Sequence, residues 1–369
     1  MIAGIQSRIE CSVRILSQAS YIYRTTYEGK DAVLKLAWMP TSLLPEGAAY
    51  QLLKNKCKDL IPEVYASGVV EQDRFGYRLD FMVIEHCGET IGELARKHYD
   101  NQEEFEAIVC SAISQASACI AKAYSAGVIH RDISTGNIAI KNGKTKVIDW
   151  GLARLLDNVE IDGISDVEEA WYFRRYIIST TQAMSSLIIG TPLFMSIQTL
   201  LGTRSRGLMD DIESMFYVAL YALGVFYETI DAYSLLCGFQ CNDEETKSVS
   251  RLGCLMDKDA YLEQFGILHC QEATTAVLNS MYKFLFYEKD INIAGRLLGD
   301  KDRERHVNID FARGFMDASL LLPDVAPNPP LRAQKIRRVQ TQSMTINDRA
   351  GDEGCIAKRT RSRTRHVKK

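Results

Sequence analysis

The fold of this chain is decided by His130-Arg131-Asp132-Ile133-Ser134-Thr135-Gly136-Asn137, followed after a short gap by Asp149-Trp150-Gly151. The apolar pairs Val128-Ile129 and Val147-Ile148 precede the two parts, so we expect strands that lead into a loop and into Asp149. An aspartate on such a loop can orient a hydroxyl group, while an asparagine five residues later and a second aspartate after a hairpin can hold magnesium. These residue types at these spacings predict a site for phosphoryl transfer.

The composition is that of an ordinary soluble globular protein, and the length is sufficient for two lobes that share an interface. The chain has 369 residues, of which 46% are hydrophobic and 25% are charged. The apolar run at residues 215–227 is shorter than the roughly 20 residues that span a bilayer, and the first residues lack a signal-peptide pattern. We therefore expect no membrane partner.

The first part of the chain has the pattern of an antiparallel sheet. Residues 12–36 alternate in three runs, with a turn at Glu28-Gly29-Lys30-Asp31 between the last two. A helix opened by Pro45 follows, and then two further strands near residues 64–70 and 81–85. Five strands and one helix are therefore expected before residue 87.

The rest of the chain is helical and then loses its periodicity. Apolar spacings of three and four residues predict helices over 90–97, 104–125 and 211–228, and several more within 253–320. From residue 323 the chain is rich in proline and then in basic residues. We predict an α+β fold of two lobes: a small antiparallel β lobe with one helix over 10–86, a larger helical lobe over 87–322, and a disordered basic tail over 323–369.

Four motifs carry a resemblance to a known family. They are His-Arg-Asp-Ile-Ser-x-Gly-Asn-Ile at 130–138, Ile-Asp-Trp-Gly-Leu-Ala at 148–153, Gly-Thr-x-x-Phe-Met-Ser-Ile at 190–197 and Asp-Asp-Ile-Glu-Ser-x-Phe-Tyr-Val at 210–218. Across about residues 15–230 the chain resembles the fungal-type protein kinase family, and residues 196–202 with the Asp-Asp-x-Glu-Ser helix are also similar to the casein-kinase-one group. The resemblance implies a bilobal protein-kinase-like fold, ATP and Mg²⁺ as cofactors, and protein substrates modified on serine or threonine.

Lys35 and Glu46 are the ion pair that the resemblance implies. Lys35 ends the run Ala32-Val33-Leu34-Lys35 on the third predicted strand, where the lysine of a kinase contacts the α- and β-phosphates. Glu46 is the only acidic residue between Lys35 and Asp59, and it lies on the predicted helix. An exposed strand lysine is the commoner alternative, but the apolar neighbours of Lys35 favour the functional role.

The roles of the remaining site residues also follow from the resemblance. Asp132 would orient the substrate hydroxyl, and Asn137 and Asp149 would bind Mg²⁺. Arg131 would either pair with a phosphorylated residue or form a structural salt bridge, and both interpretations stay open. The predicted catalytic residues are Asp132, Asn137, Lys35 and Arg131; the predicted ATP-binding residues are Lys35, Glu46, Asp149 and, through the hinge backbone, Glu85 and Cys87.

Residues 149–198 would form a long activation segment, of the kind that is usually functional or mobile. Its candidate regulatory phosphorylation sites are Thr180, Thr181, Ser185, Ser186 and Thr191. The length of this segment and the run from Gly190 to Ser196 favour a peptide substrate over a small molecule.

Two departures from the general kinase pattern lower the expected rate. The positions of the phosphate-loop glycines hold Ile15, Ser17 and Ser20, and a loop without glycine cannot bring its amides as close to the phosphates. Ser134 stands where a lysine is expected two residues after Asp132, and losing such a charge costs about 3 kcal/mol of transition-state stabilisation. The alternative function is therefore a catalytically weak or inactive kinase-fold scaffold that binds partners through its helical lobe and its tail.

The C-terminal tail differs in charge from the rest of the chain. Residues 331–369 hold 12 Lys and Arg against 3 Asp and Glu, within a chain whose net charge is −3. Such a tail suits an import receptor or another anionic partner, which predicts a cytoplasmic and/or nuclear location, and a solvated run of charge is the alternative. The tail has no Phe, Tyr or Trp, so we expect no specific nucleic-acid recognition.

Overall fold

A computed structural model of the chain describes residues 2–14, 18–72, 76–97, 101–156, 190–201, 206–228 and 267–287. The chain divides into two units, Met1–Asn328 and Pro329–Lys369, and every described element lies in the first. The predicted tail and the candidate phosphorylation sites Thr180, Thr181, Ser185 and Ser186 lie outside the described residues.

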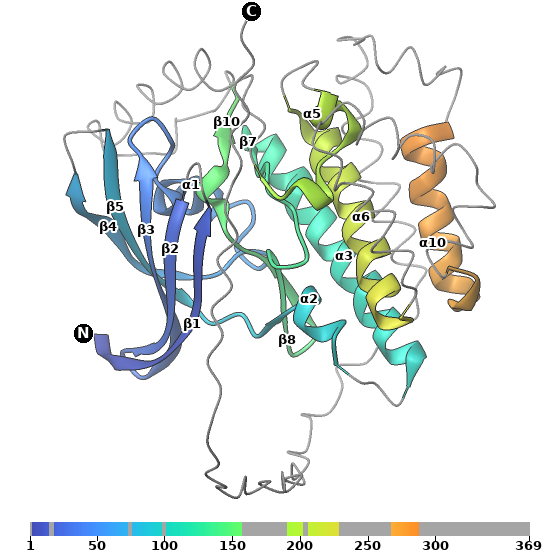
Figure 1. Cartoon of the computed structure of the whole chain (residues 1–369), viewed down its shortest axis with the longest axis horizontal. Coiled ribbons are helices and arrows are strands. Elements are labelled where there is room, and N and C mark those ends of the chain that lie inside the picture. Colours follow the sequence, from blue (N-terminus) through green and yellow to red (C-terminus); the bar gives the residue numbers. More distant parts are fainter. Residues whose placement is uncertain are drawn as a thin grey trace, which may run out of the picture. The chain divides into compact units, whose positions relative to one another are not determined.

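The first part of the chain folds into an antiparallel sheet (Figure 1). Its five strands are β1 (Ile2–Arg14), β2 (Gln18–Tyr27), β3 (Lys30–Pro40), β4 (Val64–Gln72) and β5 (Tyr77–Glu85), in the spatial order β1-β2-β3-β5-β4. Glu28 and Gly29 join β2 to β3 with φ angles of 49° and 78°, the left-handed conformation that a two-residue hairpin turn with the twist of its strands requires. The predicted three-strand start and the turn at Glu28-Gly29 are both present.

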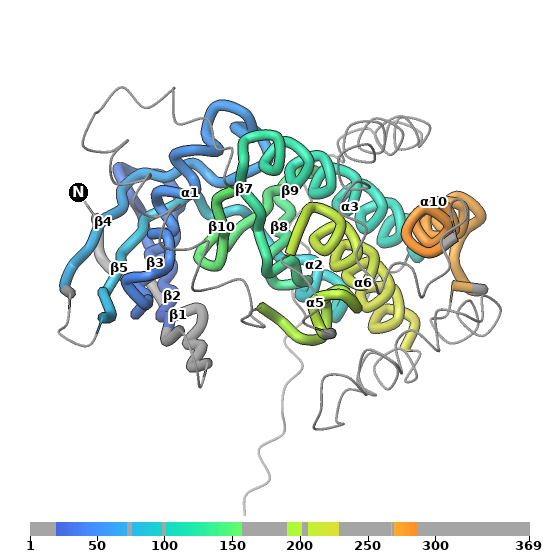
Figure 2. The backbone as a smooth tube through the Cα atoms, turned by 90° about the horizontal axis from the view of Figure 1, so that it is seen from above, coloured from blue at the N-terminus to red at the C-terminus, as the bar shows by residue number. Residues whose placement is uncertain are grey.

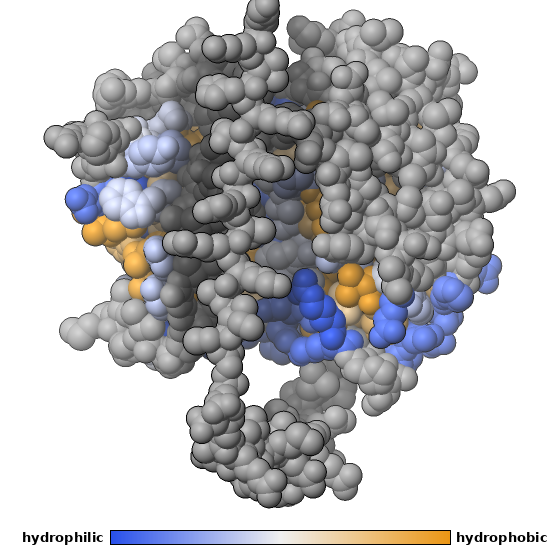
Figure 3. Space-filling model, in the orientation of Figure 1, coloured by the Kyte–Doolittle hydropathy of each residue, from blue (hydrophilic) through white to orange (hydrophobic). Residues whose placement is uncertain are grey.

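Strand β4 lies at the edge of the sheet and exposes apolar side chains. Val69 and Val70 are 50% and 59% exposed, and Figure 3 shows apolar side chains on this side of the sheet. The pairing of β4 with β5 shifts register between Val69 and Glu71. Such an irregularity interrupts the hydrogen-bonding edge and lowers the tendency of other strands to add to it.

Helix α1 (Glu46–Leu53) connects β3 to β4 and contacts β4. Its buried residues, Glu46, Ala49, Tyr50 and Leu53, recur at three- and four-residue spacing and so share one face of the helix. Pro45 precedes the first turn, where a missing amide hydrogen removes no helical hydrogen bond. Glu46 and Tyr50 therefore face the interior from consecutive turns.

The second part of the chain is mainly helical. Its helices are α2 (Ile91–Leu94), α3 (Gln102–Ser125), α5 (Ile197–Leu201), α6 (Leu208–Phe226) and α10 (Glu272–Tyr282), with single turns at Trp150–Leu152, Pro192–Phe194, Ile267–His269 and Lys283–Tyr287. Helices α3 and α6 lie side by side in both ribbon views (Figure 1, Figure 2) and contact each other directly. Helix α3 is long and apolar enough to cross a membrane by length and composition, but half of its apolar window is buried in this core, as in the central helix of a globular domain.

Short strands bring the site residues to the edge of this helical part. Strands β6 (Glu89–Thr90), β8 (Ile138–Lys141) and β9 (Lys144–Val147) form one small sheet, and β7 (Val128–Ile129) pairs with β10 (Arg154–Leu155) in another. His130 follows β7 directly, and Asp149 follows β9 after a single residue. These strand ends are those that the apolar pairs before each motif predicted.

One hydrophobic core joins the two parts. It includes Tyr50 and Leu53 of α1, Met82 and Ile84 of β5, and the inward faces of α3 and α6. Burying each large apolar side chain contributes about 1.5–3 kcal/mol, so this core supplies most of the favourable free energy of folding. The observed two-part α+β architecture confirms the predicted fold class.

Element boundaries differ from the predictions in two places. The first strand begins at Ile2, about ten residues before the predicted run, because β2 is long enough to pair with it from Tyr27 to Gln18. The helix predicted over 90–97 is helical only at Ile91–Leu94. Thr90 and Glu93 form a reciprocal capping box that starts this helix, and turns replace the helix after its first turn.

Candidate active site

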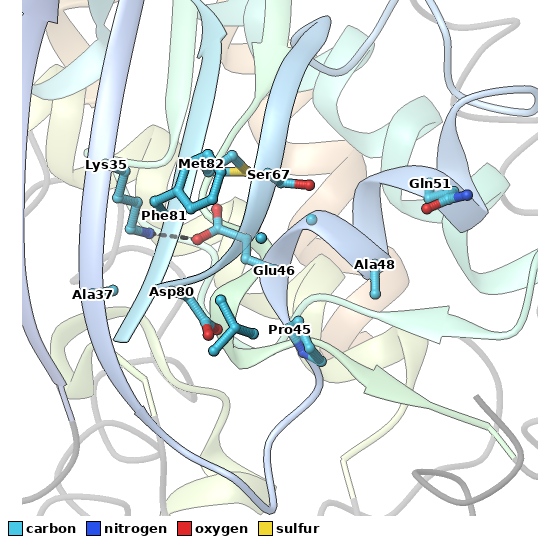
Figure 4. A pocket seen from close by; sticks show the side chains of 13 residues that line it. Lys35, Ala37, Pro45, Glu46, Ala48, Gln51, Ser67, Asp80, Phe81 and Met82 are labelled. Carbon is cyan, nitrogen blue, oxygen red and sulfur yellow. Dashed lines mark hydrogen bonds and ion pairs between the residues drawn. The ribbon is translucent and has the colours of Figure 1, made fainter. Parts of the chain in front are cut away.

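Lys35 lies between two carboxylates that come from different elements. Its Nζ is 2.8 Å from Glu46 Oε2 on α1 and 2.7 Å from Asp149 Oδ1 in the loop after β9. Figure 4 shows the lysine reaching from β3 towards Glu46, beside the side chains of Met82 and Phe81 on β5. Lys35 and Glu46 are each only 8% exposed. The sheet, helix α1 and Asp149 therefore meet at the ammonium group of Lys35.

The charges of this triad are strongly coupled. Burial opposes the charge of Lys35, but the carboxylates of Asp149 and Glu46 outweigh it and raise the pKa of Lys35. Burial raises the pKa of Glu46 to about 7, because the attraction of Lys35 only partly compensates and Asp149 adds repulsion. Glu46 Oε1 is buried and has no hydrogen-bond partner among the described residues. One cation shared by two carboxylates leaves an excess negative charge in the site, which suits the binding of a further cation.

The loop of residues 130–137 is held from below by α6. The backbone amides of His130 and Arg131 donate to Asp211 Oδ2 and Oδ1, at 2.9 and 3.1 Å. Asp211 is 2% exposed, and burial is the main cause that raises its pKa. Two amides that donate to one carboxylate fix the backbone immediately before Asp132.

His130 joins this loop to the Asp149 loop. The amide of Asp132 donates to His130 Nδ1 at 3.2 Å, and His130 Nε2 lies 3.0 Å from the carbonyl of Ile148. These two contacts require the ring hydrogen on Nε2, where it can be donated to the carbonyl. The ring also packs against Trp150, with centroids 4.5 Å apart. His130 is thus a fully buried hydrogen-bonding centre that connects the two loops.

Asp132 and Asn137 are connected through the loop backbone. Asn137 Nδ2 donates to the Asp132 carbonyl at 2.7 Å, which directs the amide oxygen of Asn137 away from this contact. Asp132 Oδ1 accepts two hydrogen bonds from Thr191, from its amide and from its hydroxyl, each 2.7 Å long. Thr191 was predicted as a regulatory residue; in the structure it orients the carboxylate of Asp132.

The oxygen atoms of Asn137 and Asp149 fit a hard cation. Magnesium is held by few protein carboxylate or carbonyl oxygens and completes its octahedron with phosphate and water. Within the described ranges no three His, Cys, Asp or Glu side chains cluster as a complete metal cage. A site with one amide and one carboxylate matches a cation that arrives with phosphate better than a cation bound by the protein alone.

Arg131 lies in a group of three arginines beneath the loop. Its Nε donates to the Leu152 carbonyl at 2.7 Å, and its φ of 68° is left-handed. Burial lowers the pKa of Arg131, and the neighbouring guanidinium groups of Arg154 and Arg206 lower it further. Within the residues that the structure describes, Arg131 forms no ion pair with a carboxylate, although Asp211 is near enough to favour its charge.

The hinge residues Glu85 and Cys87 lie at the end of β5. The Glu85 carboxylate accepts from Lys146 Nζ at 2.8 Å and from the Glu63 amide at 3.2 Å, and the Cys87 thiol contacts the Glu85 carbonyl at 3.4 Å. Burial raises the pKa of the Cys87 thiol to about 12. Their side chains therefore stabilise the connection between the lobes, and adenine binding by their backbone remains a prediction.

Two residues near the site were missed by the sequence analysis. Tyr50 lies four residues after Glu46, and this helical spacing alone would have placed it on the same face. Arg206 contacts the carbonyl of Arg131 and the hydroxyl of Thr199, at 2.9 Å for the latter. It lies far from the loop in the chain, so no local pattern could have indicated it.

Comparisons with known proteins agree with this geometry. Residues 80–223 match the family described as fungal protein kinase. The chain is 31% identical over 142 residues to the serine/threonine-protein kinase Pkn1 of Myxococcus xanthus, covering 37% of this chain and 16% of that protein. It is 27% identical over 157 residues to mitogen-activated protein kinase 12 of Danio rerio, covering 36% of this chain and 41% of that protein.

A shorter match extends the comparison to an archaeal protein. The KEOPS complex subunit Bud32 of Pyrococcus abyssi is 34% identical over 84 residues, covering 22% of this chain and 36% of that protein. The chain thus aligns with less than half the length of each of these relatives, and the similarity to the casein-kinase-one group stays a prediction. The match to the fungal protein kinase family spans residues 80–223, which hold the hinge, the loop with Asp132 and most of α6.

Proposed function

We propose that this protein transfers the γ-phosphoryl group of ATP, with Mg²⁺, to serine or threonine hydroxyls of protein substrates. The observation that supports this most is the position of Lys35 within 2.8 Å of Glu46 and 2.7 Å of Asp149. Phosphoryl transfer needs little covalent chemistry from a protein and depends on positioning and charge neutralisation. A buried cation tied to both a helix and a metal-binding loop meets that need.

Each polar group of the site has a role in this reaction. Magnesium-bound ATP would supply the transferable phosphoryl group and neutralise charge on its phosphates. Lys35 would hold the phosphates, and Asn137 and Asp149 would offer oxygen ligands to the metal. Asp132, whose Oδ1 is occupied by Thr191, would accept the hydrogen bond of the attacking hydroxyl at its other oxygen.

Protein substrates are supported by the family and by the position of Thr191. Two of the relatives described above are named as serine/threonine-protein or mitogen-activated protein kinases. Thr191 directly precedes the turn Pro192–Phe194 and donates hydrogen bonds to Asp132, so the segment that would lie against a substrate is tied to the residue that would orient its hydroxyl. This link would make the reaction sensitive to the segment around Thr191.

The test is Mg²⁺-dependent transfer of labelled γ-phosphate by the purified full chain, to itself and to casein. Asp132→Asn and Asp149→Asn are expected to abolish the label, and Asp59→Asn, at an exposed aspartate, serves as the matched control. Label that persists in both site variants would contradict the proposal.

The same samples decide between the enzyme and a scaffold. The buried Ser134 in place of a lysine favours weak or absent catalysis. A wild-type protein that transfers no label but unfolds at a higher temperature with ATP and Mg²⁺ would be a nucleotide-binding scaffold. A protein that neither transfers label nor gains stability would lack a functional nucleotide site.

We also propose that the basic tail over 323–369 binds an import receptor or another anionic partner, which would place the protein in the nucleus as well as the cytoplasm. The support is its charge, with 12 basic residues against 3 acidic ones over 331–369.

A further inference from the structure

Apart from Arg131, the loop of residues 130–137 contains no lysine or arginine. Ser134 occupies the position two residues after Asp132, and it is 7% exposed, so its side chain is enclosed by the protein. The loop's arginine, Arg131, donates its Nε hydrogen to the Leu152 carbonyl at 2.7 Å. Phosphoryl transfer nevertheless benefits from positive charge near the reacting groups. A cation from another part of the chain would have to supply it.

Arg206 is the basic residue that the fold brings to this place. It lies just before α6, and its guanidinium donates through Nη1 to the carbonyl of Arg131, the residue preceding Asp132. Its Nε donates to Thr199 Oγ1 of α5 at 2.9 Å. Arg206 thus contacts the catalytic loop at the carbonyl of Arg131, whose amide is bound by Asp211.

Arg206 and the carboxylate of Asp132 both approach Gly190 closely. A Cβ added at Gly190 would lie 3.3 Å from Arg206 Nη1 and 3.3 Å from Asp132 Oδ1. Because both atoms lie 3.3 Å from this one position, Arg206 Nη1 and Asp132 Oδ1 are separated by no more than twice that distance. Gly190 has a φ of 119° and would lie 2.6 Å from the Arg131 carbonyl if it had a Cβ, so only glycine permits this approach.

The electrostatic surroundings of Arg206 are those of a cation among carboxylates. Burial lowers the pKa of Arg206, and the carboxylates of Asp211, Asp210 and Asp132 oppose that effect. Between partly buried unit charges at this separation, the Coulomb energy corresponds to about a tenfold to hundredfold change in rate.

We propose that Arg206 is a positioning residue that supplies, from outside the catalytic loop, the positive charge beside Asp132 that Ser134 does not provide. This inference rests on the proposed kinase function. Arg206 acts through Asp132: it fixes the carbonyl of the preceding residue, Arg131, while Thr191 orients the carboxylate of Asp132.

The test moves the charge from one residue to the other. Arg206→Met is expected to lower kcat by about tenfold to a hundredfold and to leave the KM for ATP within about threefold. Adding Ser134→Lys to Arg206→Met is expected to recover at least half of that loss on a logarithmic scale. In the wild-type background Ser134→Lys is expected to change kcat by less than about threefold, because the charge is already present.

Two further variants separate charge from structural support. Thr199→Val removes the acceptor of Arg206 Nε and keeps the guanidinium, and Arg206→Lys keeps the charge and loses the fork. Both are expected to retain kcat within about fivefold of the wild type. A loss in Thr199→Val as large as in Arg206→Met, or a double variant as slow as Arg206→Met, would overturn the inference.

The outcomes also keep the inference distinct from the function on which it rests. Wild-type transfer together with an unimpaired Arg206→Met variant overturns the role of Arg206 alone, and no transfer by the wild type overturns both. If circular dichroism shows that Arg206→Met does not fold, Arg206→Gln, which removes the charge but keeps a hydrogen-bond donor, decides the matter with and without Ser134→Lys. A rise in kcat on adding Ser134→Lys is then the expected result, and no rise contradicts it.

Discussion

The hydroxyl of Tyr50 accepts a hydrogen bond from the backbone amide of Asp149 at 3.2 Å. Asp149 has a φ of 60°, a left-handed conformation that costs a residue other than glycine about 1–3 kcal/mol and persists only when its surroundings support it. Tyr50 lies one helical turn after Glu46, so α1 contacts both the ammonium of Lys35 and the backbone of the residue that Lys35 binds. The position of α1 and the conformation of Asp149 are thereby coupled.

Tyr50→Phe tests this coupling, with Tyr217→Phe as the matched control. Each variant removes one buried hydroxyl that has a hydrogen bond, to the Asp149 amide in one case and to Glu213 Oε1 in the other. Both are expected to lose about 1–2 kcal/mol of unfolding free energy in urea. Only Tyr50→Phe is expected to lower kcat, by about tenfold, because it alone loosens Asp149. Equal kcat values in the two variants would contradict the coupling.

Lys35→Met is expected to abolish phosphoryl transfer and to destabilise the protein. The substitution leaves Glu46 and Asp149 close together without their shared cation, and breaking such a buried pair costs about 3–5 kcal/mol. Lys30→Met on the same strand removes an exposed pair, 3.5 Å from Glu63, and should change stability by less than about 1 kcal/mol. Thermal unfolding and label transfer, measured on both variants, check the prediction; similar behaviour of the two would rule it out.

Glu46→Gln is expected to change how stability depends on pH. The pKa of Glu46 is raised from 4.5 to about 7 in the folded protein, chiefly by burial, so the folded state binds a proton that the unfolded state has lost between those pH values. The contribution of this group is therefore fully present below about pH 4.5 and is lost as the pH rises to about 7. Glutamine cannot titrate, so the difference in unfolding free energy between wild type and Glu46→Gln should fall across this window.

Urea unfolding at several pH values between 4.5 and 7.5 measures this difference. Glu63→Gln, at an exposed carboxylate, provides the control and should run parallel to the wild type. If Glu46→Gln also runs parallel, the carboxyl of Glu46 does not retain its proton on folding.

Deleting residues 356–369 tests the proposed function of the tail. The deleted segment holds seven Lys and Arg residues, from Lys358 to Lys369, together with His366. A fluorescent fusion of the full chain is expected in the nucleus, and the shortened fusion in the cytoplasm. An unchanged nuclear signal after the deletion would exclude import by this segment.

The polar residues of the site could be identified from the sequence because short, fixed numbers of residues separate them. Asp132 and Asn137 share one loop, and Asp149 follows a strand that the apolar pair before it already indicated. The alternation of the first strands was equally legible, since one face of the sheet is buried and register is constrained by that burial. Boundaries were less legible: the helix at Ile91–Leu94 ends early after its capping box, which apolar spacing does not report.

The sequence by itself determined the fold class and the site residues of the two motifs at 130–137 and 149–151. Each of these rests on local spacing and periodicity. Only the tertiary structure decided which distant groups meet them: Tyr50 at the Asp149 amide, Thr191 at Asp132 and Arg206 at the Arg131 carbonyl. These contacts join elements that are separated in the chain, and their formation depends on the burial of α1, α5 and α6 against one core. Packing, which brings unlike segments to the same place, is not encoded in any short window of sequence.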